Sequence, residues 1–454
     1  MIKEFEIFIP DEKIELLNKK IDLTRWPDEI NDDRWTLGAK MSYVQEAVKT
    51  WRYSFDWRKH EAKLNEAGSF KYKTKSGLEI HYLHKKSGSK NAIPLLLTHG
   101  WPGSVQEFLK IMPLLSKGKD GIGFDVICPA IPGYGFSDKP AEKGMNAQEV
   151  AKLENELMLA LGYKKYIAQG GDWGSLITKW IAELFPENCL GIHLNLVIAF
   201  PPEGQDPMEG VNAEEAEGMK NIEKYQATGY GYFAIQSTKP QTVGYGLNDS
   251  PAGLAAWIIE KFHGWTKEET DKLVVSLDEI LAIVSLYWYT ESITSSARFY
   301  YENGPLGFTF NPVSQPMAGA IFKNEIAREC LRLVPVEAPL YISTVGDVPA
   351  SSGLGSSSSF AVGLLNALHA LRGEEVSPAQ LLDEAVTVEI GKLGHPIGKQ
   401  DQAAAAYGGF NYFRFGIDGT VQLEPHSPLQ ENFESLFDHL QMFWTGITRD
   451  SASI

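Results

Sequence analysis

Residues 170–175 have the sequence GGDWGS, and this stretch decides the expected fold. The preceding residues, YKKYIAQ at 163–169, have the pattern of a buried strand, and LITKWIAELFP at 176–186 that of an amphipathic helix. A glycine-flanked aspartate is most often a turn or helix-cap residue. A glycine-rich turn between a buried strand and a helix is also the nucleophile elbow, in which the central residue is usually serine. Here Asp172 occupies that position.

A second loop supports the elbow interpretation. HGWPGS at 99–104 ends an earlier apolar strand, IPLLLTHG. In an elbow fold such a loop presents a backbone N–H to an oxyanion, and the residue after the nucleophile, Trp173, supplies the second donor. A strand-ending turn with a buried His99 is the alternative for this loop taken alone. Because both motifs occur in the right order, we favour the catalytic interpretation.

An aspartate nucleophile implies particular chemistry. Its carboxylate is ionised at neutral pH and attacks without a general base. It suits displacement at a saturated carbon, which leaves an alkyl ester on the enzyme. Water activated by a histidine and a supporting carboxylate must then hydrolyse that ester. If the leaving group is an epoxide oxygen, it stays in the product and needs a proton, for which a tyrosine hydroxyl is suitable.

The chain around these loops has an α/β pattern. Residues 1–90 are charged and aromatic, with helical segments and a strand pair around Ser76-Gly77. From Ile93 buried strands alternate with helices, which predicts a parallel sheet with helices on both faces. Residues 200–303 are mostly helical and predict a lid over the carboxyl ends of the strands. We therefore expect an α/β-hydrolase core with a helical lid over 91–322, preceded by an N-terminal meander over 1–90.

Composition limits the partners. The net charge of −16 disfavours nucleic acid and anionic membranes. The three cysteines show no metal-binding or disulfide spacing, which favours a reducing compartment. The first residues, MIKEFEIFIPDEK, carry charge throughout, and no apolar run approaches the roughly 20 residues needed to span a bilayer. We expect a soluble cytoplasmic protein, and the sequence does not predict its oligomeric state.

Residues 1–322 closely resemble the microsomal-type epoxide hydrolases. Six stretches carry the resemblance: WRYSFDWRKHEAKLN (51–65), HGWPGS (99–104), CPAIPGYGFS (128–137), GGDWGS (170–175), GYFAIQSTKPQTVGYGLNDSPAGLAAWIIEKF (231–262) and SSARFYYEN (295–303). The resemblance implies that Asp172 is the nucleophile and that Tyr232 and Tyr300 protonate the epoxide oxygen. It also implies that Trp101 and Trp173 supply the oxyanion-hole amides. It implies a small epoxide as substrate and no cofactor.

Three features depart from that family. Glu325, in AIFKNE, falls where the family has its charge-relay carboxylate, but Lys323 replaces the usual proline. The family's GGHF motif, which carries the catalytic histidine, is absent from the sequence, as is the membrane anchor of the animal enzymes. None of the ten histidines lies in a GGHF context, and we interpret each as a surface or core residue. We therefore expect ester hydrolysis to be impaired.

A different motif follows. The stretch VPASSGLGSSSSFAVGLLNALHALRG at 348–373 is a glycine- and serine-rich loop that runs into a helix. Converging backbone amides and a helix N-terminus favour anion binding, and the expected phosphate-binding residues are Gly353, Gly355, Ser356, Ser357 and Ser358. A flexible linker is the alternative for such a run, although the helix that follows at once argues against it. No Walker A motif is present.

This segment resembles the galactose/homoserine/mevalonate/phosphomevalonate (GHMP) kinases. The heptose-phosphate kinase branch is the nearest, through EIGKLGHPIGKQDQAAAAYGGFNYFRF (389–415) and FWTGITRDSASI (443–454). The resemblance implies ATP and Mg²⁺, with Ser357 and Glu389 as metal ligands and Asp401 beside the substrate hydroxyl. It covers 323–454 only, as a partial kinase domain of α+β type.

Two partial enzymes therefore meet near Phe322–Lys323. The leading hypothesis is an epoxide hydrolase that forms an aspartyl ester and hydrolyses it poorly. An ATP-dependent sugar-phosphate kinase and an inactive chimeric chain are the two alternatives.

Overall fold

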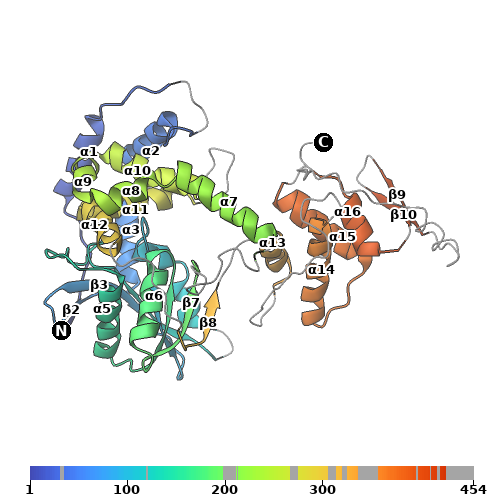
Figure 1. Ribbon diagram of the computed structural model, residues 1–454, viewed down its shortest axis with the longest axis horizontal. Coiled ribbons are helices and arrows are strands. Elements are labelled where there is room, and N and C mark those ends of the chain that lie inside the picture. The colour runs from blue at the N-terminus through green and yellow to red at the C-terminus, as the bar shows by residue number, and fades with distance from the viewer. Residues whose placement is uncertain are drawn as a thin grey trace. The chain divides into compact units, whose positions relative to one another are not determined.

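The structure is a computed structural model, and it divides into two compact units, Met1–Ile321 and Phe322–Ile454. Figure 1 shows the ribbon of each unit. The described residues are 1–30, 35–118, 121–197, 211, 213–265, 275–304, 313–319, 325–335, 356–394, 397–409, 411–416 and 420–425.

An eight-stranded sheet forms the base of the first unit, in the order β1-β2-β3-β5-β4-β6-β7-β8. The strands β5, β4, β6, β7 and β8 are mutually parallel, and β1, β2 and β3 add antiparallel pairs at one side. The bounds are β1 (Ile2–Glu4), β2 (Ser69–Lys73), β3 (Glu79–Lys85), β4 (Ile93–Thr98), β5 (Phe124–Pro129), β6 (Tyr166–Gly170), β7 (Cys189–Leu194) and β8 (Met317–Gly319).

Helices α5 (Ala147–Ala160) and α6 (Trp173–Leu184) pack side by side against this sheet. Each turns an apolar stripe inward, and side chains such as Val150, Leu157 and Ile177 are fully buried. Helix α5 begins at Asn146, whose side chain accepts a hydrogen bond from the Glu149 N–H. Helix α6 begins immediately after Asp172. The parallel strands, the helices between them and the hairpin around Ser76-Gly77 follow the predicted α/β pattern.

The N-terminal helices α1 (Asp11–Asp22), α2 (Met41–Tyr53) and α3 (Trp57–Glu66) pack on lid helices rather than on the sheet alone. The indole N–H of Trp51 donates a buried hydrogen bond of 2.8 Å to the Ser285 hydroxyl. The ammonium of Lys13 donates to the Tyr289 carbonyl at 3.0 Å. The meander therefore holds the lid from outside.

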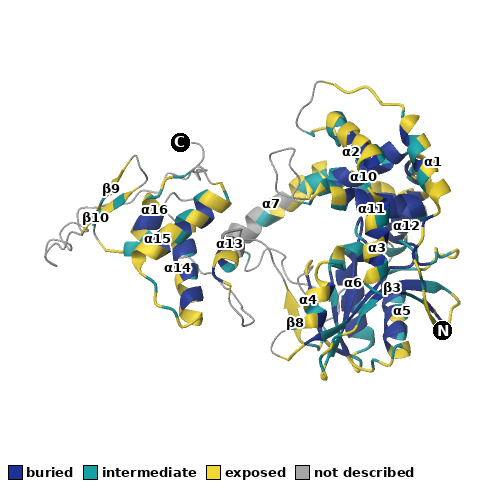
Figure 2. Cartoon of the chain, turned by 180° about the vertical axis from the view of Figure 1, so that it is seen from behind, coloured by how far each residue is buried: buried dark blue, intermediate teal, exposed yellow. Residues whose placement is uncertain are grey.

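The lid consists of helices above the sheet, and Figure 2 shows buried residues, in dark blue, concentrated on α10, α11 and α12. Helix α11 is apolar on every face, and its residues from Ile280 to Tyr289 are buried, which is typical of a helix surrounded by protein. The helices are α7 (Ala213–Thr228), α8 (Gly231–Thr238), α9 (Pro240–Asp249), α10 (Pro251–Gly264), α11 (Leu277–Thr290) and α12 (Ile293–Asn303).

The helical segment after the loop at 99–104 is divided. The apolar pattern of VQEFLKIMPLL at 105–115 predicts one helix, but the chain forms a 3-10 turn, η1 (Val105–Phe108), and then α4 (Met112–Lys117). Pro113 explains the break, because proline lacks an N–H and fits only the first turn of a helix. The Ser104 and Glu107 side chains form a capping box that begins η1 and fixes the end of the preceding loop.

The second unit has a small core of its own. Its elements are α13 (Glu325–Leu333), α14 (Ser356–Leu371), α15 (Pro378–Val386), a π-helical turn η3 (Thr387–Lys392), α16 (Gln400–Tyr407) and the hairpin β9 (Asn411–Phe415) and β10 (Val421–Pro425). Cys330, Ala361, Leu365 and Val388 are fully buried at its centre. Helix α14 begins within the serine run, at Ser356. This part of the run is therefore helical, whereas the linker alternative predicts a flexible segment.

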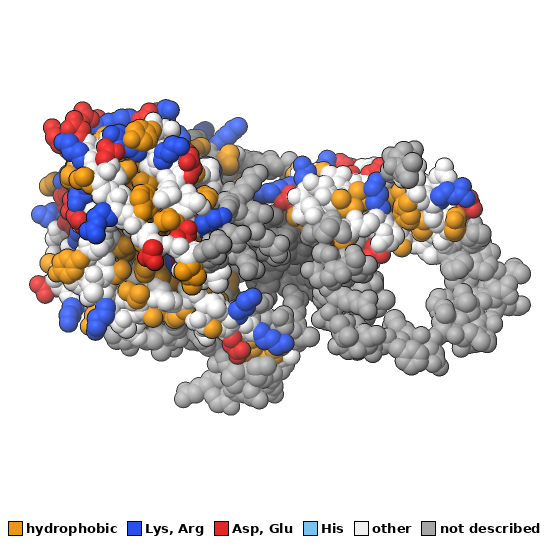
Figure 3. Space-filling view, turned by 90° about the horizontal axis from the view of Figure 1, so that it is seen from above, with side chains coloured by type: hydrophobic (Ala, Val, Ile, Leu, Met, Phe, Trp, Pro, Cys, Tyr) orange, Lys and Arg blue, Asp and Glu red, His pale blue; other side chains and the backbone are white. Residues whose placement is uncertain are grey.

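The described surface carries both signs of charge. On the face of the first unit seen in Figure 3, basic and acidic side chains are interspersed around apolar ones. That face therefore offers no uniformly basic surface for a polyanion. Among the described residues, no helix combines the length and the apolar character that crossing a membrane requires.

Candidate active site

Asp172 lies on a strained turn between β6 and α6. Its φ of 53° and ψ of −127° are outside the regions that non-glycine residues ordinarily adopt. Two glycines allow this turn. A Cβ on Gly170 would lie 2.0 Å from the Gly174 carbonyl oxygen, and one on Gly174 would lie 2.0 Å from the Thr98 carbonyl oxygen. The backbones of β6, α6 and the end of β4 are therefore so close together that no side chain fits between them.

We expect Gly174→Ala to destabilise the first unit by more than about 3 kcal/mol, because the added methyl group would overlap a backbone carbonyl that cannot move cheaply. Gly171→Ala is the matched control, since its Cβ would meet the Asn195 Cβ at an ordinary 3.5 Å. That control should cost less than about 1 kcal/mol. Denaturant unfolding measures both variants, and equal stabilities would contradict this account of the turn.

The loop after β4 meets the Asp172 carboxylate. The Trp101 backbone N–H donates to Oδ1 of Asp172 at 2.9 Å, and the Trp173 N–H also hydrogen-bonds this carboxylate. Burial raises the pKa of Asp172, and the two N–H donors oppose that rise because they favour the ionised form. Gly100 permits the approach, since a Cβ there would lie 2.3 Å from Oδ1 of Asp172.

Hydrogen bonds from the lid residue Tyr287 and from the first residue of the loop, His99, fix the conformation of the loop at 99–104. The Tyr287 hydroxyl on α11 donates to the Gly103 carbonyl at 3.0 Å. His99 donates from Nδ1 to the Gly100 carbonyl at 3.0 Å and accepts at Nε2 from the Ile131 N–H at 3.2 Å. Burial lowers the pKa of His99 to about 4. Both ring nitrogens are therefore occupied, and His99 is a neutral structural residue.

Below this loop lies a buried carboxyl, Glu154 on α5, which is 3% exposed. The Thr98 hydroxyl donates to its Oε2 at 2.8 Å, and its Oε1 has no hydrogen-bond partner among the described residues. Burial raises the pKa of Glu154 from 4.5 to about 8. The side chain is thus protonated at neutral pH beneath the strand that leads into the oxyanion loop.

This carboxyl predicts a pH dependence. Because the folded pKa of Glu154 lies above the unfolded one, the folded chain binds an extra proton between pH 4.5 and about 8. The free energy of unfolding should therefore fall as pH rises through that window. We expect Glu154→Gln to remove about 2–4 kcal/mol of this fall, as measured by denaturant unfolding at several pH values. The exposed Glu142→Gln variant is the control, and a Glu154→Gln profile parallel to that of the unmodified chain would contradict the prediction.

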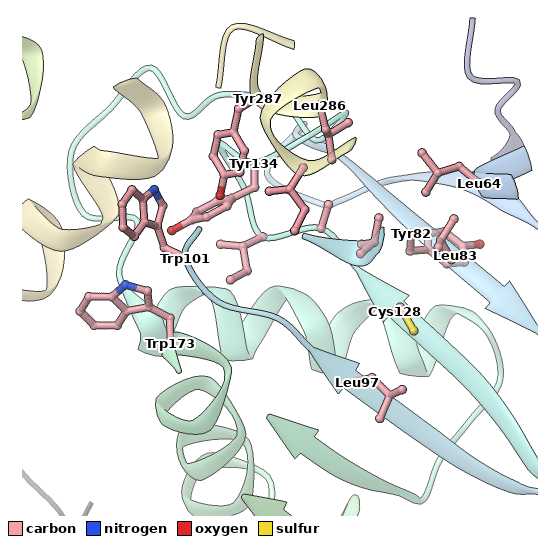
Figure 4. Close-up of a cluster of buried hydrophobic side chains, with 14 of the residues drawn as sticks. Leu64, Tyr82, Leu83, Leu97, Trp101, Cys128, Tyr134, Trp173, Leu286 and Tyr287 are labelled. Atoms are coloured by element: carbon pink, nitrogen blue, oxygen red, sulfur yellow. The ribbon is translucent and has the colours of Figure 1, made fainter. Parts of the chain in front are cut away.

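The two predicted acids lie against the two tryptophans. The Tyr232 ring on α8 stacks on Trp101 with ring centroids 5.4 Å apart, and the Tyr300 ring on α12 meets Trp173 edge-on at 4.8 Å. The two tyrosine rings are 5.9 Å apart. Figure 4 shows Trp101 and Trp173 side by side, with Tyr134 and Tyr287 next to Trp101. The described geometry therefore brings Asp172, both tryptophans and both tyrosines into one cluster.

Both tyrosines keep their protons at neutral pH. Burial is the first cause that raises the pKa of Tyr232 and of Tyr300, and the negative charge of Asp172 adds to both. The Tyr232 hydroxyl is hydrogen-bonded to the hydroxyls of Tyr225 and Tyr300. Two protonated phenols in contact can thus supply a proton within the site.

Seven histidines lie in the described part of the chain, and the rings of six of them contact groups other than Asp172. His60 contacts Asp278, His81 hydrogen-bonds Ser69, His84 hydrogen-bonds Tyr163 and His263 stacks on Trp35. His369, in the second unit, is held between Glu374 and Glu384. His193 lies on β7 opposite Gln169, and burial lowers its pKa. His395, His426 and His439 lie outside the described residues.

Glu325, the expected carboxylate partner of a catalytic histidine, is the first residue of α13 in the second unit, and its side chain lies outside the description.

The kinase-like residues are brought together only in part. Gly353 and Gly355 lie outside the described residues, as does the side chain of Ser356. Ser357 is exposed, whereas Ser358 is 1% exposed and its hydroxyl has no hydrogen-bond partner in the part of the chain that the structure describes. Glu389 is fully buried and its Oε2 accepts from the Gln402 amide at 2.7 Å. Asp401 lies in the first turn of α16 and is exposed.

That arrangement differs from the expected metal site. Ser357 faces solvent and Glu389 faces the core, because the register of α14 turns Ser358 inward instead. Among the described residues, no group of three or more acidic, histidine or cysteine side chains is placed to hold a metal ion.

A cavity of about 390 Å³ lies elsewhere in the first unit. Pro132, Arg298 and Phe299 contribute to its lining, and none of the five clustered residues does. This cavity therefore does not contain the Asp172 carboxylate or the groups clustered around it, and it is separate from the candidate site.

Family models match three parts of the chain. The model described as "Epoxide hydrolase N terminus" matches residues 2–108, and the model described as "alpha/beta hydrolase fold" matches residues 93–219. The model described as "GHMP kinases N terminal domain" matches residues 321–409. The first two meet within the oxyanion loop and together include Asp172.

Relatives and solved structures cover the first unit. A relative from Stigmatella aurantiaca is 43% identical over 72% of this chain and 75% of its own length. Epoxide hydrolase 1 of Sus scrofa is 40% identical over 72% of this chain and 79% of its own length. The juvenile hormone epoxide hydrolase of Bombyx mori superposes with a TM-score of 0.65 at 32% identity, covering 70% of this chain and 82% of that one. These similarities agree with an α/β-hydrolase fold.

Proposed function

Because the chain belongs to the epoxide hydrolase family, we propose that it opens epoxides through an ester on Asp172 and hydrolyses that ester slowly. The carboxylate that meets two backbone N–H donors on a strained elbow carries this proposal. Such a turn costs about 1–3 kcal/mol of strain. It gives the carboxylate an orientation that a relaxed loop would not hold.

The first step follows from the clustered groups. A carboxylate oxygen of Asp172 forms a bond to one epoxide carbon while the ring C–O bond breaks. The electron pair stays on the ring oxygen, which takes a proton from the hydroxyl of Tyr232 or Tyr300. The products are a hydroxyalkyl ester on Asp172 and a tyrosine phenolate. No cofactor enters this step.

The second step requires a different group. Water must add to the ester carbonyl, and the Trp101 and Trp173 N–H groups are placed to stabilise the oxyanion that forms. The attacking water gives up both of its protons: one goes to the diol oxygen as the ester C–O bond breaks, and the other returns to the phenolate. The Asp172 carboxylate is thereby restored. Water attack needs a base, and the described histidines with partners are occupied elsewhere. Hydrolysis of the ester is therefore the slow step.

Removing the nucleophile tests this proposal. Asp172→Asn keeps the size and the hydrogen-bonding oxygen but removes the negative charge. We expect it to abolish epoxide consumption, measured as loss of styrene oxide by chromatography with the chain in excess. Consumption at an undiminished rate in a variant with an intact circular dichroism spectrum would refute the assignment.

Phosphoryl transfer by the second unit is a weaker candidate. Its match to the GHMP kinase model is consistent with nucleotide binding, and Mg²⁺ would be needed beside the phosphates. The exposed Ser357 and the buried Glu389 do not form a joint ligand pair among the described residues. We assign no kinase activity to the chain.

A further inference from the structure

Lys261 is a buried lysine beside one of the proposed acids. It lies on lid helix α10 and is only 4% exposed. Its ammonium lies over the face of the Tyr232 ring, 4.4 Å from the centroid, and 6.0 Å from the Trp265 ring centroid. It also forms an ion pair with the Glu260 carboxylate. A cation in this position is attracted to the ring even when the phenol is neutral.

The attraction changes during ring opening. When Tyr232 gives up its proton, negative charge appears on the phenolate and spreads into the ring beneath the ammonium. A fixed cation in a site with little water stabilises that charge more strongly than it stabilises the neutral phenol. Interactions that strengthen in the transition state are those that raise the rate.

The other surroundings of Tyr232 act on its pKa in both directions. Burial raises the pKa most, and Tyr225 on α7 and the negative Asp172 raise it further, whereas the hydrogen bond to Tyr300 on α12 lowers it. Lys261, compensated on its other side by Glu260, is a cation held against the face of the ring.

We propose that Lys261 is an electrostatic positioning residue that makes Tyr232 the stronger of the two proton donors during epoxide opening. This inference rests on the proposed function, because it requires Tyr232 to be an acid. A purely structural lysine is the alternative. In that case its alkyl chain covers apolar lid surface, and its ion pair with Glu260 contributes stability.

A double-mutant cycle separates the two explanations. The rate measured is formation of the Asp172 ester under single-turnover conditions with styrene oxide. We expect Lys261→Met to slow it about 10- to 30-fold, the loss expected for a desolvated cation–π contact. In a Tyr232→Phe background the same change should have no further effect. In a Tyr300→Phe background, where Tyr232 is the remaining acid of the pair, the loss should be at least as large.

Two further variants complete the test. Lys261→Arg keeps the charge over the ring and should retain most of the rate. Lys224→Met, which removes an exposed lysine from lid helix α7, should leave the rate unchanged. With Lys261→Met the rate should also respond differently to pH, because the acid is weaker, whereas a packing defect lowers the rate equally at every pH.

The outcomes are distinguishable. If Lys261→Met slows ester formation equally in the Tyr232→Phe background, Lys261 acts through folding and the inference is wrong. If Lys261→Met has no effect in any background, the inference is also wrong. If Tyr232→Phe and Tyr300→Phe are both silent, singly and together, the acid assignment of the proposed function fails first, and that failure is visible without any lysine variant.

Discussion

Mixed with excess styrene oxide, the chain should consume about one epoxide per molecule and release little diol. The groups proposed to open the ring, Asp172, Tyr232 and Tyr300, all lie in the clustered site of the first unit. The GGHF motif that carries the family's base for ester hydrolysis is absent from the sequence. Loss of general-base assistance slows a step by about 10²–10⁴-fold. The ester should therefore form rapidly and break down very slowly.

Chromatographic measurement of epoxide and diol over time gives this stoichiometry. A burst of one equivalent followed by a nearly flat line is expected. Steady release of many equivalents of diol would mean that another group activates water. His193, on the strand next to the one that leads to Asp172, would then be the first residue to replace, by His193→Ala.

Replacing both tyrosines by phenylalanine should reduce ester formation by at least about 10³-fold. Each phenol alone can protonate the departing oxygen because the two hydroxyls are in contact, so the single variants should lose less. Without either acid the ring oxygen must leave as an unprotonated alkoxide, which is a much stronger base than the Asp172 carboxylate whose charge it takes over, and burial penalises that charge further. The phenyl rings preserve the ring contacts with Trp101 and Trp173, so the fold should persist.

The matched control is the Tyr230→Phe, Tyr301→Phe double variant. Tyr230 is the N-cap residue of α8, two residues before Tyr232, and Tyr301 directly follows Tyr300 in α12 and is 39% exposed. Single-turnover rates measured by quenched-flow should be unchanged in the control. An undiminished rate in the Tyr232→Phe, Tyr300→Phe variant would show that water or another residue supplies the proton.

The features that could be predicted from the sequence are those fixed by local patterns. The elbow at 170–175 predicted the strand, the turn and the helix around Asp172, because alternating apolar residues and glycines determine them locally. The division of residues 105–115 was missed, although Pro113 and the Ser104–Glu107 pair signal it. In the sequence, a capping box at the end of a loop is a weaker signal for a break than the apolar periodicity of 105–115 is for one continuous helix.

Contacts between distant segments could not be predicted. Tyr287 supports the oxyanion loop from a lid helix 184 residues away, and nothing in the pattern of α11 distinguishes it from the other buried residues of that helix. In the sequence, Lys261 cannot be distinguished from an ordinary surface lysine. Its burial depends on the tertiary packing of α10 and on the position of Tyr232 in α8, which local patterns do not determine. In the second unit, the one-residue choice between Ser357 and Ser358 depends on the register of α14 against its core.

Mass spectrometry of the chain after incubation with styrene oxide tests the central claim most directly. We expect the intact mass to rise by one epoxide per molecule, and the added mass to map to the peptide that contains GGDWGS. Asp172→Asn should show no added mass, and mild alkaline treatment of the adduct should release the diol. An adduct on any other residue, or rapid diol production with no adduct at Asp172 at any time point, would contradict the account.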